Sequence, residues 1–224
     1  MKGFVLDLQA MAEYLPLYKD AALLTVGIGW AGIAGSIVIG LAVALVIRFR
    51  IPVARQLCRA YVELFRNTPL LIQLFFFYFG LPRFGFSITP QLCGALGLAL
   101  HGGAYMAESF RAGFESVDTI QRESSLALGL TRLQAVKYVI LPQAVTLAFP
   151  SFVANVIFLL KETSVFSAIS LMDLMFATKD LMGLYYRTTE CLLMLVLFYL
   201  AILLPVSIIG SVIERRLRYA SFGD

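Results

Sequence analysis

The 224-residue chain is far more apolar than a water-soluble protein. Hydrophobic residues make up 60% of it and charged residues only 14%, against roughly one quarter charged residues in a soluble domain. So few charges cannot cover a water-facing surface, and the composition excludes a soluble enzyme, a disordered chain and a disulfide scaffold. The net charge of +4 fits basic cytoplasmic loops rather than nucleic-acid binding. We therefore expect an all-α membrane protein.

Five segments are apolar enough to cross a bilayer. A span needs about 20 mostly apolar residues, and four stretches between successive charges meet that length. The fifth is short unless its helix begins near Ala60, which puts Glu63 and Arg66 on one helix face close to the interface. The sequence thus predicts about five transmembrane helices in a single domain over residues 1–224. Their approximate bounds are 21–47, 60–81, 86–107, 145–170 and 190–213.

The basic residues predict how these spans are oriented. Five spans place the two termini on opposite sides of the membrane. If the C-terminus is cytoplasmic, the inner segments carry twelve Lys and Arg residues and the outer ones six. Inner loops are the ones enriched in Lys and Arg. We therefore expect Met1 outside the cell and Asp224 in the cytoplasm.

The loop over 111–142 has the signals of two short helices. Residues 116–118 offer an N-cap for a helix over 119–128, and Gly129 ends that helix as a left-handed glycine would. Thr131 can cap a second helix, which we expect to stop at Pro142. Two short helices joined at a glycine corner predict a compact hairpin that projects from the membrane on its inner side.

The motif within this loop resembles that of a known family. Residues 123–129 read Glu-Ser-Ser-Leu-Ala-Leu-Gly, and Ile-Leu-Pro follows at 140–142. This spacing resembles the "EAA…G…ILP" loop of bacterial ABC-importer permeases, which usually has two alanines where this chain has Ser124 and Ser125. Further segments resemble the polar amino-acid branch of that family. They lie at 65–74, 104–113 and 160–164.

The resemblance implies a type I ABC importer in the bacterial inner membrane. This chain would be the permease subunit for polar amino acids of the glutamine, glutamate, aspartate, arginine, histidine or cystine class. It would form half of the translocation pathway. Its expected partners are a cytosolic ABC ATPase dimer, a second permease subunit (the same or a homologous chain), an extracytoplasmic substrate-binding protein, the lipid bilayer and the amino-acid substrate. We expect no nucleic-acid partner.

The energy for transport would come from the ATPase. The sequence has no G-x-x-x-x-G-K-[ST] loop for binding phosphates. We therefore expect no catalytic residue, no metal site and no cofactor in this chain, with ATP bound by the partner. The hairpin would act as a rigid lever, and Glu123 would charge its docking surface or brace its corner. The expected ATPase-coupling residues are Glu123, Ser124, Ser125, Gly129, Leu130 and Leu133.

Four polar residues interrupt the apolar sequence after residue 160. If the fourth span begins near Pro150, Lys161 to Ser164 fall near its middle, where transporters place their substrate sites. Glu162 would accept the ammonium of an amino acid, and Lys161 with the hydroxyls of Thr163 and Ser164 would bind its carboxylate. The alternative is that Lys161 and Glu162 form a structural ion pair at the outer interface.

Other polar residues in the spans are weaker candidates for a functional site. Gln73 is a further candidate for the substrate path, although it is as suited to bonding another helix. Glu108 is expected to pair with Arg111.

A different class of protein, a stand-alone secondary transporter or channel, should show inverted repeats and intramembrane carboxylates. The sequence has no visible repeat, and Glu162 is the one such acid that it offers. A membrane-bound enzyme lacks any cluster of His, Cys, Asp and Glu.

Overall fold

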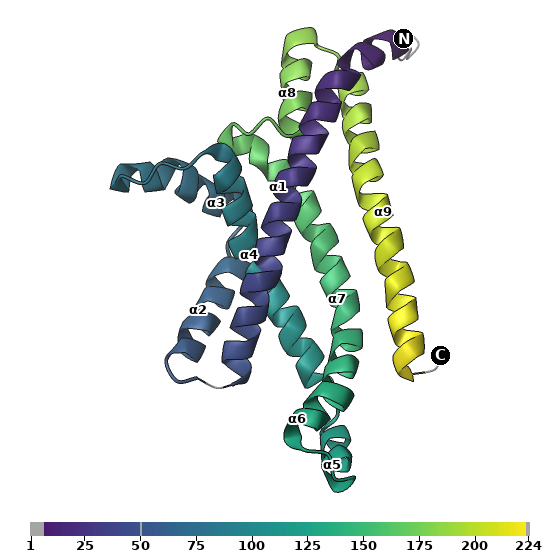
Figure 1. Ribbon diagram of the computed structural model, residues 1–224. Coiled ribbons are helices and arrows are strands. Elements are labelled where there is room, and N and C mark those ends of the chain that lie inside the picture. The colour runs from purple at the N-terminus through teal and green to yellow at the C-terminus, as the bar shows by residue number, and fades with distance from the viewer. Residues whose placement is uncertain (1–6, 50, 223–224) are drawn as a thin grey trace. The chain divides into compact units, whose positions relative to one another are not determined.

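The computed structural model describes residues 7–49 and 51–222, in which every regular element is a helix, so the predicted all-α class is confirmed (Figure 1). The α-helices are α1 (Leu8–Arg48), α2 (Ala54–Arg66), α3 (Leu70–Phe75), α4 (Pro90–Glu115), α5 (Thr119–Ala127), α6 (Arg132–Ala135), α7 (Leu141–Glu162), α8 (Leu174–Tyr185) and α9 (Thr188–Phe222). Two π-helical segments, η1 (Phe76–Gly80) and η3 (Val136–Ile140), and two 3-10 segments, η2 (Leu81–Phe84) and η4 (Thr163–Ile169), complete the order. The predicted positions of Met1 and Asp224 fall outside the described residues.

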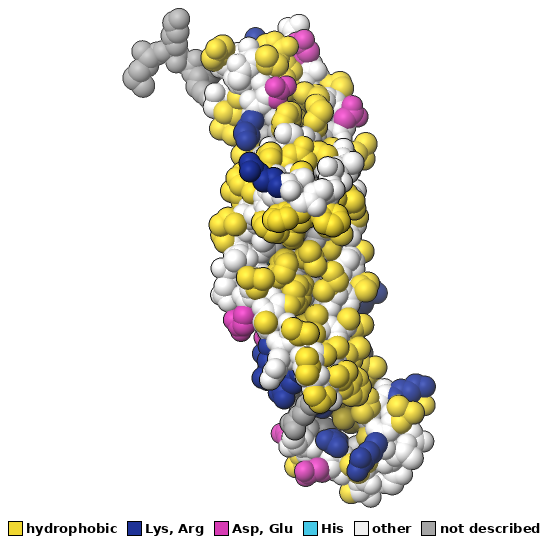
Figure 2. Space-filling model, turned by 90° about the vertical axis from the view of Figure 1, so that its left-hand side faces the viewer, with side chains coloured by type: hydrophobic (Ala, Val, Ile, Leu, Met, Phe, Trp, Pro, Cys, Tyr) yellow, Lys and Arg dark blue, Asp and Glu magenta, His cyan; other side chains and the backbone are white. Residues whose placement is uncertain are grey.

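Three helical stretches of the described chain are long and apolar enough to cross a membrane. They are Leu8–Arg48, Arg132–Ile169 and Thr188–Tyr219, and a fourth is added if Ala54–Arg66 and Leu70–Phe84 count as one bent span. The predicted span at 86–107 lies in α4, whose 26 residues measure about 39 Å. The count of five therefore stays a prediction. Hydrophobic side chains cover much of the visible surface, as a lipid-facing surface requires (Figure 2).

The chain divides into two compact units, each built from three segments. Unit 1 consists of Met1–Gly35, Thr68–Ala99 and Leu159–Pro205, and unit 2 of Ser36–Asn67, Leu100–Phe158 and Val206–Asp224. Four long helices, α1, α4, α7 and α9, contribute residues to both units. The units are therefore not successive domains along the sequence.

The expected continuous helix over 60–81 is interrupted in the structure. α2 ends at Arg66 and α3 begins only at Leu70, after Pro69 at φ −59° and ψ 141°. A proline has no N–H to donate, and it pushes the preceding residue, here Thr68, out of the helical region. The phenylalanine-rich part of the segment therefore starts as a new helix.

Two prolines inside helical runs are each preceded by a π turn. Leu141, the residue before Pro142, donates its N–H to the carbonyl of Val136, five residues back. Leu81, the residue before Pro82, donates its N–H to the carbonyl of Phe76 in the same way. The expectation that the second hairpin helix stops at Pro142 is wrong, since helix continues from Arg132 to Ile169. The wider turn accommodates a residue that lacks an N–H and whose ring crowds the carbonyl four residues back.

Unit 1 has a core in which the first part of α1 packs against α8 and the start of α9 (Figure 1). Tyr18 is fully buried there, with its hydroxyl 2.8 Å from the carbonyl oxygen of Cys191 and 3.0 Å from the Thr178 hydroxyl. Thr25 Oγ1 accepts a hydrogen bond from the N–H of Leu174 at 3.1 Å. These polar groups find their hydrogen-bond partners in other helices. The bonds therefore join α1 to α8 and to the start of α9.

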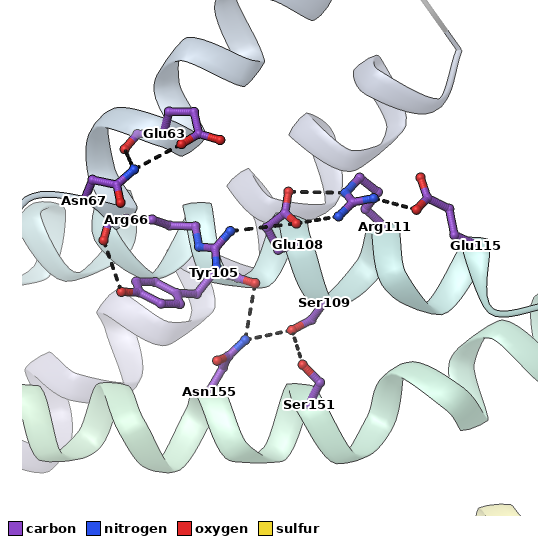
Figure 3. A network of polar contacts seen from close by, with 10 residues as sticks. All are labelled: Glu63, Arg66, Asn67, Tyr105, Glu108, Ser109, Arg111, Glu115, Ser151 and Asn155. Atoms are coloured by element: carbon purple, nitrogen blue, oxygen red, sulfur yellow. Dashed lines mark hydrogen bonds and ion pairs between the residues drawn. The ribbon is translucent and has the colours of Figure 1, made fainter.

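Unit 2 contains a charged network between α2 and α4 (Figure 3). Arg111 forms a two-point contact with Glu108, with Nη2 2.7 Å from Oε2 and Nε 3.2 Å from Oε1, as the sequence predicts for this pair. Arg111 also contacts Glu115, and Arg66 Nη1 lies 3.8 Å from Glu108 Oε2. A carboxylate that binds two guanidinium groups holds both helix ends in register.

The same stretch of α4 is also joined to α7 by hydrogen bonds (Figure 3). The Ser109 and Ser151 hydroxyl oxygens are 2.6 Å apart, and Asn155 Nδ2 donates to Ser109 Oγ at 2.7 Å and to the Tyr105 carbonyl at 3.3 Å. Such side chains hydrogen-bond across helices in membranes, where little else drives polar groups together. They hold the helix that follows the hairpin against the helix that precedes it.

Within unit 2, α1 and α4 approach too closely for a side chain at Gly40. A Cβ there would lie 2.5 Å from Met106 Cβ and 2.9 Å from the Ala107 backbone nitrogen, whereas a Cβ at Gly27 meets nothing within 4 Å. We expect Gly40→Ala to lower the unfolding free energy by about 1–3 kcal/mol. Gly27→Ala should raise it by roughly 0.5–1 kcal/mol, because alanine loses less backbone entropy in a helix.

Thermal unfolding of the purified protein in detergent measures both variants. The opposite signs make the matched pair a test of the close approach itself. Equal effects of the two substitutions would contradict it.

Candidate functional site

The hairpin over 119–135 is built from three local capping motifs. Asp118 caps α5 by accepting a hydrogen bond from the N–H of Ile120 at 3.0 Å. Thr131 caps α6 in a reciprocal box with Gln134, in which each side chain bonds the other residue's backbone N–H. Both predicted N-caps are confirmed, so the sequence itself specifies where the two helices start.

The corner between the helices is a complete Schellman motif. Gly129 has φ +86°, the left-handed conformation that the sequence predicts. Its N–H donates to the Leu126 carbonyl at 3.0 Å, and the N–H of Leu130 donates to the Ser125 carbonyl at 3.2 Å. These are the two hydrogen bonds by which a left-handed glycine ends a helix. The corner is therefore rigidly defined by its backbone.

The six predicted coupling residues divide between the inside and the outside of the hairpin. Ser125 is buried, as is Ala135, and α5 contacts α6 and η3. Glu123 and Ser124 are exposed, Leu133 is 78% exposed, and Leu130 is half-buried. Glu123 forms no ion pair with any described residue, which favours a role in docking over bracing the corner.

The sequence reasoning missed further apolar side chains exposed on this hairpin, among them Ile120 at 58% and Leu128. Leu128, at the C-cap of α5, is 84% exposed and, like Leu133, is an apolar side chain on a polar segment. A large apolar side chain on a short capped hairpin is the signal that identifies it. Exposed apolar residues rimmed by polar ones are typical of protein-binding surfaces.

The second predicted site lies in unit 1, where α7 ends. Lys161 and Glu162 form its last turn, and Thr163 and Ser164 begin η4. Lys161 is exposed and Glu162 half-buried. Successive helical residues point in different directions, and neither side chain forms an ion pair with a described residue. The alternative of a Lys161–Glu162 ion pair therefore has no support in the geometry.

Gln73 lies on α3, which packs against η4. It is buried, and its Nε2 donates to Thr68 Oγ1 at 2.8 Å and to the Thr68 carbonyl at 3.0 Å. These bonds hold the start of α3 where Pro69 interrupts the helical hydrogen bonds. The structure thus brings the helix of Gln73 next to Thr163 and Ser164, with the amide nitrogen bonded within its own segment.

Two residues beside this site were missed by the sequence reasoning. The Tyr199 hydroxyl lies 3.5 Å from Thr163 Oγ1. Asp173 is fully buried and caps α8 by accepting hydrogen bonds from the N–H groups of Phe176 at 3.0 Å and Met175 at 3.3 Å. An aspartate directly before an apolar helical run is an N-cap signature, and this pattern in the sequence could have identified Asp173.

The polar groups of residues 161–164 can bind both charged ends of a small molecule. They are one carboxylate, one ammonium and hydroxyl groups, the complement of a small zwitterion. Among the described residues there is no group of His, Cys, Asp and Glu that could hold a metal ion.

Comparisons with known proteins give a consistent result. The family described as "Binding-protein-dependent transport system inner membrane component" matches residues 36–219. A probable amino-acid ABC transporter permease protein of Vibrio harveyi, PatM, is 34% identical, with 96% of this chain and 97% of the relative covered. The glutamine transport system permease protein GlnP of Escherichia coli K12 is 32% identical, with 95% and 98% covered. A solved chain of an amino acid ABC transporter with histidines is 32% identical, with 95% and 100% covered and a TM-score of 0.88.

The burial of Asp173 makes the stability of unit 1 depend on pH. Burial raises the pKa of its carboxyl to about 6, against the lowering effect of the Phe176 and Met175 N–H groups. The folded protein therefore holds this proton more tightly than the unfolded chain does. Above the folded pKa the charged carboxylate destabilises the fold, and this penalty, on the order of 3 kcal/mol, disappears as the pH falls towards 4.

Asp173→Asn should remove this dependence and keep the capping oxygen. Its advantage in unfolding temperature over the unmodified protein should therefore grow between about pH 4 and pH 7. Asp180→Asn, an exposed carboxylate on the same helix, is the matched control and should follow the unmodified protein. A constant difference across this range would show that Asp173 is not the buried titrating group.

Proposed function

The chain belongs to the family of binding-protein-dependent transport system inner membrane components, and from this membership we propose that it is the permease subunit of an ATP-driven importer of polar amino acids. Relatives that match over nearly the whole chain carry names for amino-acid, glutamine and arginine transport permeases. A stand-alone transporter or channel, the other class considered, has no such support. The subunit is a multi-pass protein of the inner membrane and works with an ATPase and a binding protein.

The observation that carries the proposal is the α5–α6 hairpin. Its corner is fixed by backbone hydrogen bonds, while Leu128 and Leu133 leave apolar side chains exposed on a polar segment. A rigid element with an apolar tip is suited to sit in a cleft of the ATPase and to pass on its rigid-body motion. α7 continues from the hairpin without a break in the helix. Movement of the tip would therefore reach residues 161–164 directly.

The substrate would pass Lys161, Glu162, Thr163 and Ser164. Lys161 is exposed within a segment apolar enough to span the membrane. An ammonium that faces lipid costs several kcal/mol, so such a group is expected to face water or a partner. Its exposure thus supports a path completed by a second permease subunit. Glu162 would bind the ammonium of the amino acid, and Lys161 with the hydroxyl groups would bind the carboxylate.

The finer points of assembly follow from the same proposal. Two permease subunits, identical or homologous, would bind a dimer of ATPases, and the binding protein would deliver the amino acid from outside. The twelve-to-six distribution of basic residues supports an N-terminus outside and a C-terminus in the cytoplasm. The α5–α6 hairpin would then face the ATPase.

A substitution series at Gly129 tests whether the hairpin passes the motion of the ATPase to the membrane helices. A Cβ at this position meets nothing within 4 Å, so the cost of a side chain is the left-handed backbone alone. Gly129→Val should strain the corner by about 1–3 kcal/mol, and Gly129→Asn should cost less because asparagine tolerates this region. We expect uptake by the reconstituted transporter to fall several-fold for valine and little for asparagine.

Membrane insertion and co-purification with the ATPase serve as controls in this series. The measurement compares substrate uptake with ATPase stimulation by the loaded binding protein. If Gly129→Val transports normally, the hairpin corner does not transmit the motion.

A charge-removing substitution at Glu162 tests the substrate path. Glu162→Gln keeps the shape and loses one charge-assisted hydrogen bond, worth about 1.5–3 kcal/mol. Substrate binding in the membrane domain should weaken by roughly ten-fold or more. Lys161→Met should act in the same direction at the carboxylate end. Glu13→Gln, an exposed carboxylate on α1, is the control.

The decisive readout is ATPase stimulation by the loaded binding protein relative to the empty one, together with uptake. The binding protein has its own site, so its affinity should not change. Wild-type stimulation and uptake in Glu162→Gln would remove residue 162 from the path, whatever the outcome at Gly129.

A further inference from the structure

Unit 2 contains a charged cavity of about 560 Å³ that the transport proposal does not use. Its walls come from the end of α1, one face of α2 and the end of α4, and they include the Arg66–Glu108–Arg111–Glu115 network (Figure 3). The volume lies within the usual range for a ligand site. The lining residues are Ala44, Ile47, Arg48, Arg55, Arg59, Val62, Glu63, Arg66, Glu108, Arg111, Phe114 and Glu115.

The charges in this cavity are not balanced. Glu108 and Glu115 are bound to Arg111, and Glu63 accepts a hydrogen bond from Asn67. The remaining arginines, Arg48, Arg55 and Arg59, form no ion pair with any described residue. Arg55 Nε is buried and has no hydrogen-bond partner there. A buried guanidinium N–H without an acceptor is costly, so the cavity is suited to an anion.

The surroundings of the cavity are apolar. α2 is amphipathic, with Arg55 and Arg59 one turn apart on the cavity face and Leu57 and Leu64 exposed on another. The turn before α2 exposes Ile51 and Val53. Exposed apolar side chains next to arginines are typical of a segment at the membrane surface, where the apolar part enters the lipid and the charges stay at headgroup depth.

A second, apolar hollow adjoins this cavity. It has a volume of about 370 Å³ and shares Phe114 as a wall with the charged cavity. Its α1 lining is Ile37 and Leu41, and the two hollows together cover α1 from Ile37 to Arg48, about 16 Å along the helix axis. That length is close to half of the roughly 30 Å hydrocarbon thickness. Its lining is Ile37, Leu41, Phe110, Phe114, Ala144, Val145, Ala148, Phe149 and Phe152.

We propose that the two hollows together form a site for one anionic phospholipid. The phosphate group binds Arg48, Arg55 and Arg59, and one acyl chain lies in the hollow beyond Phe114. Guanidinium groups suit phosphate because they donate two parallel hydrogen bonds to its oxygens. Basic pockets between membrane helices on the cytoplasmic side bind anionic headgroups in this way. A free phosphate would use the charged cavity alone, whereas a lipid uses both.

The site is lined by residues that flank the hairpin in the sequence. Glu115, the last residue of α4, lines the charged cavity, and Asp118 caps α5 three residues later. The apolar hollow includes Ala144 and Val145 of α7, which follow the hairpin on its other side. A bound lipid therefore stabilises the helices on both sides of α5 and α6. This inference is independent of residues 161–164.

Native mass spectrometry of the purified transporter complex tests the site. The complex is titrated with dioleoylphosphatidylglycerol, which is anionic, or with dioleoylphosphatidylcholine, which is zwitterionic. We expect phosphatidylglycerol to bind at least ten-fold more tightly. Arg55→Gln with Arg59→Gln should weaken it by about ten-fold or more, as expected for lost charge-assisted hydrogen bonds. The control, Arg215→Gln with Arg216→Gln, removes two exposed arginines of α9 and should bind as the unmodified complex does.

A second arm separates the lipid from a free anion. Leu41→Gln makes the apolar hollow polar and should weaken phosphatidylglycerol without changing competition by inorganic phosphate. Leu200→Gln, at a similarly exposed apolar position, is its control. If Leu41→Gln has no effect and inorganic phosphate displaces the lipid fully, the site binds a free anion and the lipid proposal is overturned.

Three other results would also overturn it. One is equal retention of the two lipids, and another is wild-type retention of phosphatidylglycerol by the Arg55 and Arg59 double variant. The third is binding of neither lipid nor phosphate, which would mean that a protein side chain fills the cavity in the complex. If the double variant fails to fold, Arg48→Gln with Arg59→Gln removes two phosphate ligands and leaves Arg55 in place.

Discussion

Peptide groups inside a membrane find no water to bond, so each N–H and C=O of a span needs a partner in the protein. This constraint explains the local backbone at three of the prolines. Pro69 falls where one helix ends and another begins, and Gln73 bonds back to Thr68 at that break. Pro82 and Pro142 fall just after π turns, which keep the helix continuous. The continuity at Pro142 is what connects the hairpin to the polar residues at the end of α7.

Polar side chains obey the same constraint. Tyr18 and Thr25 in unit 1, and Ser109, Ser151 and Asn155 in unit 2, bond to other helices or to backbone carbonyls. Such bonds set which helices lie together, since apolar surfaces gain little from leaving lipid. Against this background, the groups that lack protein partners stand out. Within the part of the chain that the structure describes, Lys161 and Glu162 lie in a candidate span without an ion pair, and Arg55 has a buried N–H without an acceptor.

The two functional regions differ in how they are held. The hairpin is fixed by local hydrogen bonds at Asp118, Gly129 and Thr131, so its shape depends on few contacts from other segments. The region around Thr163 depends on contacts from distant segments, including α3, Tyr199 and the close approach of Gly29. In the proposed mechanism, a locally fixed hairpin would act as a lever on a region assembled from several segments, so that motion at one end would rearrange the other.

Local signals in the sequence determined the helical class, the hairpin's caps, the left-handed Gly129 and the pairing of Glu108 with Arg111. Each depends on residues within one or two helical turns, whose geometry is fixed by backbone hydrogen bonding and side-chain reach. Only the tertiary structure decided that the helix passes through Pro142, that Asp173 is buried, that Leu128 is exposed and that Arg55 borders a cavity. These properties depend on which distant helices pack around a residue. A single sequence records the apolar pattern that makes helices pack, but not which neighbours they choose.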